Sequence, residues 1–153
     1  MLNIDLEHNT FEMLACCFRA SSKPMIFVVV YRPGSAAPTA DFFAQLIMLF
    51  EIIATYKSDV IILGDFNIHV NDVNDQHGQR LLQILDDFNL IQHVVGPTHT
   101  LGNTLDLVIT SSATAPLLTR ADPPVYSDHG LVTCLLPPAP VVTNTFKQLI
   151  IRS

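Results

Sequence analysis

The sequence predicts a single α/β domain in which strands alternate with helices. Short runs of apolar, β-branched or aromatic residues are bounded by turn-forming residues, as expected of strands. Two longer segments between them repeat apolar residues with a helical period. With 153 residues, 49% of them hydrophobic and 14% charged, the chain is long enough for one sizeable core and too short for two ordinary domains.

The first half of the chain contains a predicted hairpin, a helix and a buried strand. Phe11 to Phe18 and Met25 to Tyr31 are apolar runs joined by turn residues, which predicts two paired strands. Apolar residues recur at helical spacing from Asp41 to Tyr56, which predicts a helix with a broad buried face. Asp59 to Gly64 shows no alternation of polar and apolar residues, which is typical of a strand covered on both faces.

The second half adds one helix and four short strands. The polar stretch 71–78 can cap a helix at Asn74 or Asp75, and the apolar stripe of that helix is Leu81, Leu82, Leu85 and Phe88. Strands are predicted at 90–95, 104–110, 117–120 and 130–136. In the second of these, alternation places Asp106 on the face opposite Leu105, Leu107 and Ile109.

Charge and hydropathy exclude several classes of protein. The net charge of −6 and only eight Lys and Arg residues argue against strong nonspecific nucleic-acid binding, but they are compatible with an acidic metal site. The mean hydropathy is high, at +0.37. The longest apolar stretch, Phe42 to Tyr56, nevertheless contains Gln45 and Glu51 and falls short of a membrane span. Residues 1–7 lack the pattern of a signal peptide. We therefore expect no membrane association.

The cysteines indicate a reducing compartment. Their number is odd and their spacing fits no metal site, and neighbours on one strand point to opposite faces. We expect all three to be reduced core residues of an intracellular protein, nuclear or cytoplasmic: Cys16, Cys17 and Cys134.

The most informative feature is Gly64-Asp65-Phe66-Asn67, at the end of the buried strand. A carboxylate and an amide at a strand end lie where open α/β sheets place their chemistry, although Asp and Asn are also ordinary turn residues. Further along the chain come other groups suited to metal-assisted phosphoester hydrolysis: Asp106, Asp128 and His129.

Asp106 can orient the ring of His129, as carboxylates commonly do for working imidazoles. The alternatives are a surface His129 and an Asp106 that is a satisfied buried polar group. The other histidines show no zinc-site spacing and are expected in loops or on the surface, with His69 close enough to Asn67 to line the site: His8, His69, His77, His93 and His99.

Four ordered motifs resemble a known superfamily. Tyr31-Arg-Pro, Gly64-Asp-Phe-Asn67, Leu105-Asp-Leu107 and Ser127-Asp-His129 look like the successive motifs of the endonuclease/exonuclease/phosphatase superfamily. Within it, Pro97-Thr98-His99 followed by residues 104–110 is similar to the endonuclease domains of animal non-LTR retrotransposons. The resemblance covers residues 11–136 and leaves 137–153, which begins Pro137-Pro-Ala-Pro140, as a proline-rich linker and tail.

The resemblance implies a four-layered α/β sandwich, with two facing mixed sheets and outer helices, and Mg²⁺-dependent cleavage of a phosphoester by water, with Mn²⁺ as a possible substitute. By resemblance, Asp65 activates or positions the water beside Asn67. His129, held by Asp106, binds the scissile phosphate. Asp128 lies near the metal, and Tyr31 offers its hydroxyl to the phosphate.

The family's front end has no counterpart here. Family members begin with a strand carrying Asn, a helix, and a strand ending in the Glu that binds the metal; Asn3, Glu7 and Glu12 do not sit in a matching context. We therefore expect a partial sandwich, truncated at the N-terminus and lacking those strands and that helix, with weakened Mg²⁺ binding and uncovered apolar surface. The partners implied are DNA, as in the full-length family, and an adjoining reverse transcriptase domain in a longer parent.

Three hypotheses on function stay open. The first is a DNA endonuclease of retrotransposon origin with impaired activity. The second is a non-catalytic remnant or binding module of the same fold. The third is a phosphatase acting on a small phosphorylated lipid or sugar, which the low Lys and Arg content favours.

Overall fold

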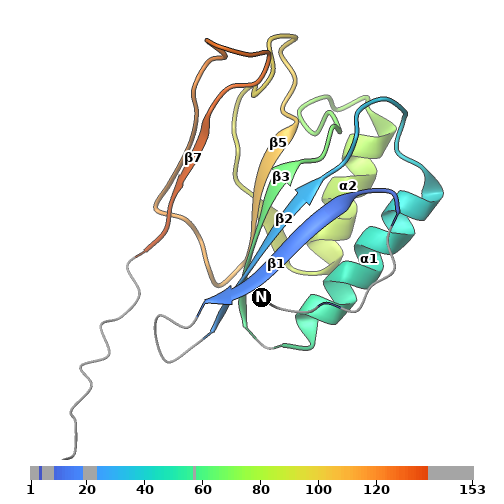
Figure 1. Ribbon diagram of the computed structural model, residues 1–153, viewed down its shortest axis with the longest axis vertical. Helices are drawn as coiled ribbons and strands as arrows, with labels where there is room; N and C mark the ends of the chain where they lie inside the picture. Colours follow the sequence, from blue (N-terminus) through green and yellow to red (C-terminus); the bar gives the residue numbers. More distant parts are fainter. Residues whose placement is uncertain (1–3, 5–8, 19–23, 57, 138–153) are drawn as a thin grey trace, which may run out of the picture.

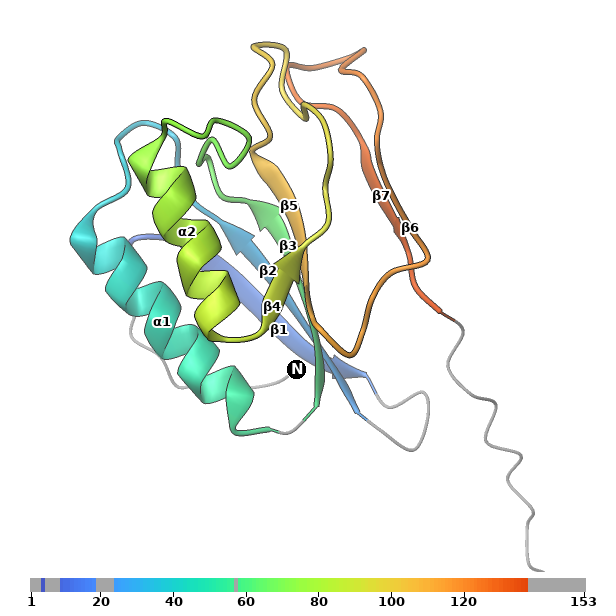
Figure 2. The ribbon, with the colours of Figure 1, turned by 180° about the vertical axis from the view of Figure 1, so that it is seen from behind.

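The computed structural model describes residues 4, 9–18, 24–56 and 58–137. Over these residues the chain forms a five-stranded sheet with two helices on one face and a two-stranded sheet over part of the other face (Figure 1; Figure 2). The elements in chain order are β1 (Glu12–Phe18), β2 (Met25–Tyr31), α1 (Ala40–Ala54), β3 (Asp59–Asp65), α2 (Gln76–Asp87), β4 (Leu90–Gln92), β5 (Asp106–Ser111), β6 (Leu118–Ala121) and β7 (Val132–Leu135).

The larger sheet has the strand order β1-β2-β3-β5-β4. β1 and β2 form the predicted antiparallel pair, β2 runs parallel to β3, and β5 is antiparallel to both β3 and β4. Four Cα atoms line up across adjacent strands in the order Glu12, Tyr31, Asp65 and Asp106. Because residues paired in register point to the same side of a sheet, these four side chains share one face at one end of the strands.

The main core lies between the sheet and the helices. Its fully buried side chains include Phe42, Phe43, Leu46 and Leu49 from α1, Leu81 and Leu85 from α2, and Val28, Ile62 and Ile109 from the sheet. Asp75 caps α2 by accepting hydrogen bonds from the backbone N–H groups of His77 and Gly78, so the cap is Asp75 rather than Asn74. Leu107 and Ile109 are buried in this core with Asp106 on the opposite face, which confirms the alternation predicted for β5.

Gly64, directly before the last residue of β3, has a backbone conformation that favours glycine. Its φ of 148° is one that side chains rarely adopt, and a Cβ there would lie 1.8 Å from the backbone oxygen of Val30. Only glycine therefore lets β3 stay paired with β2 immediately before Asp65.

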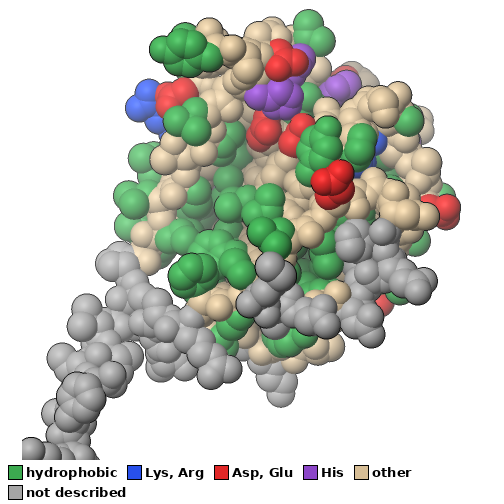
Figure 3. Space-filling model, in the orientation of Figure 1, with side chains coloured by type: hydrophobic (Ala, Val, Ile, Leu, Met, Phe, Trp, Pro, Cys, Tyr) green, Lys and Arg blue, Asp and Glu red, His purple; other side chains and the backbone are tan. Residues whose placement is uncertain are grey.

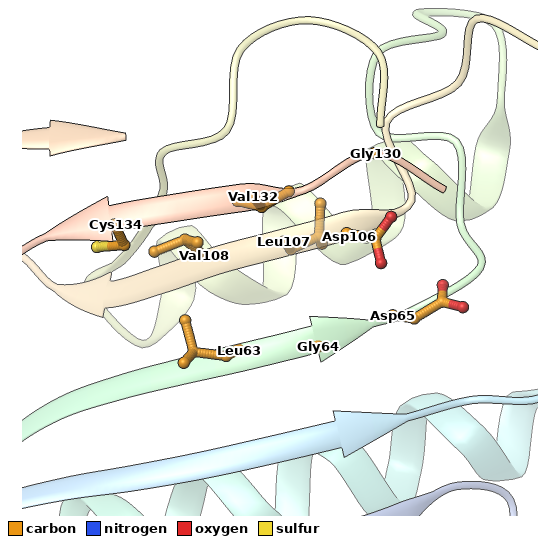
Figure 4. A pocket seen from close by; sticks show the side chains of 9 residues that line it. All are labelled: Leu63, Gly64, Asp65, Asp106, Leu107, Val108, Gly130, Val132 and Cys134. Atoms are coloured by element: carbon orange, nitrogen blue, oxygen red, sulfur yellow. The ribbon is translucent and has the colours of Figure 1, made fainter. Parts of the chain in front are cut away.

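The sheet face away from the helices is apolar and only partly covered. The β6–β7 hairpin stands over β3 and β5 and encloses a hollow of about 390 Å³, lined by Leu63, Val108, Val132 and Cys134 and ending at Asp65 and Asp106 (Figure 4). Over β1 and β2 the apolar side chains face outward, with Leu14 53% and Phe18 60% exposed. In Figure 3 hydrophobic side chains form a broad area below the acidic and histidine side chains.

Two expectations need correction. The strand predicted at 90–95 ends at Gln92, because the Gln92 side chain accepts a hydrogen bond from the Val94 backbone N–H. Cys17 is exposed, since it is the penultimate residue of the edge strand β1, and Cys16 and Cys134 are only half-buried.

Among the described residues, no helix is both long and apolar enough to cross a membrane. Residues 138–153 of the predicted linker and tail lie outside the described residues.

Candidate active site

Asp65 and Asn67 form a tight polar turn at the end of β3. Asp65 Oδ1 accepts from the Asn67 backbone N–H at 2.9 Å, and Asp65 Oδ2 accepts from Asn67 Nδ2 at 2.9 Å. Asn67 has a φ of 49°, in the left-handed region that Asn tolerates better than most residues. The turn therefore fixes the carboxylate and the amide side by side, as the sequence predicted.

Arg32 stabilises this turn through hydrogen bonds to its backbone. It is 5% exposed, and its guanidinium donates to the backbone oxygens of Phe66 at 2.7 Å and Asn67 at 2.6 Å, as well as to those of Pro33 and Ala36. In return, Asn67 Nδ2 donates to the Arg32 backbone oxygen at 2.8 Å. Burial lowers the pKa of the Arg32 guanidinium, and the charge of Asp65 opposes that shift. In the sequence, Arg32 stands out only as part of the Tyr31-Arg-Pro motif, and its contacts with backbone oxygens are seen only in the fold.

Asp106 begins β5 directly opposite Asp65. Its Oδ2 lies 2.8 Å from His129 Nδ1, so the predicted contact of this carboxylate with the His129 ring is present. The backbone N–H groups of Leu105 and Asp106 donate to Thr98 Oγ1 at 2.9 and 3.0 Å, and Thr98 is fully buried. Thr98 therefore fixes where β5 starts.

The charges around His129 and Asp65 change the pKa values of both. Burial lowers the pKa of His129, but Asp106, Asp65 and Asp128 together raise it above its usual value. Burial raises the pKa of Asp65, with a further contribution from the charge of Asp106, while hydrogen bonds from Asn67 and the charge of His129 oppose the rise. The rise in the pKa of His129 indicates a site with more negative than positive charge.

His99 joins the site, contrary to the expectation that it is an ordinary loop or surface residue. Its ring packs edge-on against that of His129 at 5.0 Å between centroids, and its Nε2 lies 3.5 Å from Asp128 Oδ2. His69, expected close enough to Asn67 to line the site, has its Nδ1 3.2 Å from Asp75 Oδ2. The contact of His99 depends on a bridge between two distant loops, so its spacing in the sequence gave no signal.

Four residues aligned across adjacent strands form a register row: Glu12, Tyr31, Asp65 and Asp106. Tyr31 and Glu12 are its members nearer the β1 edge of the sheet. Tyr31 is 45% exposed, one strand from Asp65. Glu12 is exposed and lies two strands from Asp65, a separation of about 10 Å at the usual strand spacing. Tyr31 is therefore beside the site, whereas Glu12 is at its far edge.

Two groups of side chains among the described residues bring possible ligand atoms within 4.8 Å of one another: Asp65, Asp106 and His129, and His99, Asp128 and His129. The first group contains two carboxylates, and the charge of Asp106 adds to the rise in the pKa of Asp65 that burial chiefly causes. Mg²⁺ is commonly held by one or two carboxylates plus waters and phosphate, so the donors of this group fit such an ion.

A family model described as Endonuclease-reverse transcriptase matches residues 25–133, which include the site residues Tyr31, Asp65, Asn67, Asp106 and His129. The chain belongs to this family. The matched range also contains every strand of the larger sheet except β1. No curated protein matches the chain.

The chain also resembles solved structures with the endonuclease/exonuclease/phosphatase fold. The endonuclease domain of TRAS1, a telomere-specific non-LTR retrotransposon, is 19% identical with a TM-score of 0.59, over 77% of this chain and 58% of that domain. A 3′ phosphatase from Neisseria, bound to a product DNA hairpin, is 20% identical with a TM-score of 0.59, over 82% and 64%. An endonuclease/exonuclease/phosphatase family protein from Leptotrichia buccalis is 10% identical with a TM-score of 0.51, over 86% and 62%.

These similarities establish the fold. The described residues have a mixed α/β architecture with two sheets and two helices, in agreement with the predicted partial sandwich. It spans between 58% and 64% of the length of these three structures.

Proposed function

We propose that this chain is a Mg²⁺-dependent phosphodiesterase domain of retrotransposon origin that acts as a DNA endonuclease. The observation that carries the proposal is the contact of His129 Nδ1 with Asp106 Oδ2 at 2.8 Å, directly across from the Asp65–Asn67 turn. An oriented imidazole beside a carboxylate and an amide can bind a phosphate and direct a water toward it.

Each side chain has a definite task in this proposal. Asp106 Oδ2 accepts a hydrogen bond from His129 Nδ1–H, and Nε2–H of the protonated ring donates to an oxygen of the scissile phosphate. Asp65 accepts a proton from the attacking water or positions it, while the amide of Asn67 keeps the carboxylate in place. Tyr31, which is exposed on the neighbouring strand, offers its hydroxyl to a phosphate oxygen.

Mg²⁺, with Mn²⁺ as a substitute, would be held by the carboxylates of Asp65 and Asp106, with Asp128 nearby. A bound divalent ion lowers the pKa of water and neutralises charge that develops on the phosphate oxygens. We infer weak metal binding and impaired activity, because Glu12 lies at the far edge of the register row and neither ligand group among the described residues includes a glutamate.

A plasmid-nicking assay tests this function. Supercoiled plasmid should be nicked in Mg²⁺ or Mn²⁺, and nicking should be lost in Asp65→Ala and in His129→Ala. Asp86→Ala and His69→Ala are matched controls, because Asp86 is exposed on α2 and His69 lies beside Asp75. Absence of nicking by the unaltered chain, with Mg²⁺ and Mn²⁺ both tested, would reject an endonuclease.

The open apolar face supports a second candidate, a non-catalytic module of the same fold. Leu14, Phe18 and Val29 are each about half exposed or more on one side of β1 and β2. Such a surface suits binding better than catalysis. Calorimetry that finds no Mg²⁺ binding, together with strong binding of a hydrophobic dye, would favour this candidate.

A third candidate is a phosphatase on a small phosphorylated lipid or sugar. The low number of Lys and Arg residues favours a substrate smaller than DNA. Release of phosphate from such substrates without plasmid nicking would distinguish it.

For the endonuclease, we propose DNA as substrate, an adjoining reverse transcriptase domain in a longer parent, and a nuclear or cytoplasmic location.

A further inference from the structure

The loops 97–100 and 127–130 are joined by a short antiparallel bridge. The Gly130 backbone N–H donates to the Thr98 oxygen at 2.8 Å, and the Thr100 N–H donates to the Asp128 oxygen at 2.9 Å. These two bonds flank His99 and His129, which are bridge partners. The two histidines are therefore a non-hydrogen-bonded pair, the type in which facing side chains come closest.

We propose that His99, Asp128 and His129 form a binding site for a transition metal ion such as Zn²⁺. One possible ligand atom from each of these residues lies within 4.8 Å of the others. His99 Nε2 is 3.5 Å from Asp128 Oδ2, and the two imidazole rings are 5.0 Å apart. Small adjustments of the three side chains would bring the donors to the roughly 2 Å from one ion that such metals require.

The chemistry of the donors selects the class of metal. Two imidazoles and one carboxylate suit Zn²⁺, Ni²⁺, Co²⁺ or Cu²⁺, whereas Mg²⁺ prefers oxygen ligands. Asp128 is 70% exposed while His99 is only 14% exposed, so the ion would enter from solvent on the side of Asp128. Water can complete the coordination there.

Hydrogen bonds determine which ring nitrogen of each histidine carries the proton. Asp106 Oδ2 accepts a hydrogen bond from His129 Nδ1–H, so in the neutral ring Nε2 keeps a lone pair, in the arrangement common among metal-binding histidines. The Leu101 backbone N–H donates to His99 Nδ1 at 3.2 Å, so the metal-free ring carries its proton on Nε2. Metal binding at Nε2 moves that proton to Nδ1. The Leu101 N–H, which lies in an exposed turn, then donates its hydrogen bond to water.

This site would have a consequence for the proposed function. An ion that occupies a nitrogen of His129 prevents that ring from contacting a phosphate, so Zn²⁺ would inhibit a hydrolase in which His129 is catalytic. Only this consequence rests on the proposed function. Binding of the ion itself is independent of catalysis and is measured without DNA or Mg²⁺.

The test is calorimetric titration of Zn²⁺ into the full chain after removal of metals, at neutral pH. We expect one ion per chain, and we expect His99→Gln to weaken binding about tenfold or more. His69→Gln is the matched control, because His69 also lies beside a carboxylate, Asp75, but that pair belongs to neither group of three ligands. Unchanged affinity in His99→Gln, or equal loss in both variants, would overturn the site.

A second measurement uses the unaltered chain and does not depend on any variant being folded. In nitrogen-resolved NMR of the imidazoles, one equivalent of Zn²⁺ should shift the rings of His99 and His129 and move the proton of His99 from Nε2 to Nδ1. The rings of His69, His77 and His93 should be unaffected. A shift confined to those three rings, or no shift at all, would contradict the proposal.

Discussion

The backbone N–H of Asp106 donates to Thr98 Oγ1 at 3.0 Å, so a fully buried threonine determines the position of the carboxylate that contacts His129. The same hydroxyl also accepts from Leu105, and the Thr98 backbone oxygen accepts from Gly130 on the other side. Thr98 thus connects the start of β5 to the loop that carries His129. A single residue, through its hydroxyl and its backbone oxygen, thus connects two parts of the site that are more than twenty residues apart.

Thr98→Val should destabilise the fold by about 1–3 kcal/mol, because an apolar side chain of the same shape leaves the buried N–H of Leu105 and the half-buried N–H of Asp106 without this acceptor. Chemical denaturation measures this loss as a lower midpoint at an unchanged slope. Thr100→Val, an exposed neighbour, is the control and should change the midpoint little. Equal midpoints for the two variants would show that the Thr98 hydroxyl is not needed.

Asp106→Asn should lower the pKa of His129, because Asp106 is the main cause of its rise. The raised pKa means that His129 stabilises the folded state fully below its unfolded pKa, and that this contribution is lost as the pH rises through the folded value. The variant should therefore show a smaller fall in unfolding free energy over that pH window. NMR titration of the His129 ring measures the pKa directly, and an unchanged value would contradict the role assigned to Asp106.

Asp65→Asn should raise the melting temperature of the metal-free protein at neutral pH. The folded-state pKa of Asp65 is raised, chiefly by burial, so the ionised carboxylate costs stability above its unfolded pKa and an uncharged amide does not. Differential scanning calorimetry in a chelating buffer measures the change, with Asp86→Asn as the exposed control. The same substitution should abolish any stabilisation by Mg²⁺. A lower melting temperature in Asp65→Asn would indicate that its bonds to Asn67 outweigh the cost of burial.

Arg32→Met should cost about 3 kcal/mol or more, because backbone oxygens that now accept from the guanidinium lose a charged donor. Arg32→Lys should restore only part of the loss, since an ammonium cannot copy the planar arrangement of donors. Arg80→Met is the control: Arg80 is exposed and its guanidinium lies 4.4 Å from the centre of the Phe43 ring, a contact of about 0.5–1 kcal/mol. Urea denaturation of the three variants gives the order, and a full rescue by Lys would refute the geometric argument.

The apolar area over β1 and β2 should bind a hydrophobic dye. Replacing Leu14 and Phe18 together by Ser should reduce dye fluorescence clearly, because both side chains are more than half exposed on the same strand and face. Val73→Ser removes a side chain that is 79% exposed in a loop away from the sheet and should change little. Equal fluorescence from all three proteins would mean that the dye reports some other surface.

Much of this arrangement follows from local sequence. The unbroken apolar run of β3 and its terminal Gly predict a buried strand with Asp65 at its end, and the alternation in β5 places Asp106 opposite its core residues. The contact of Asp106 with His129 was predicted from residue types and is present. Asp75 was one of two candidate caps for α2, and the sequence alone did not choose between it and Asn74.

The features that escaped prediction depend on contacts between distant segments. His99 approaches Asp128 and His129 only because two loops form a bridge, which no periodicity reveals. The donors of Arg32 are satisfied by backbone oxygens of the turn after β3, and backbone partners leave no mark on composition. Cys17 was expected in the core because its strand is apolar, but burial also depends on whether a strand lies at the sheet edge.

The site is sensitive to changes in the length of its strands, because it depends on the alignment of Glu12, Tyr31, Asp65 and Asp106 across them. A single residue inserted or deleted inside β3 would turn Asp65 toward the helices and bring an apolar neighbour to the open face. The same change in the loop before β6 would leave the row intact. Among natural variants of this family that differ by small insertions, those within the strands should lose function, and those in the loops should be tolerated.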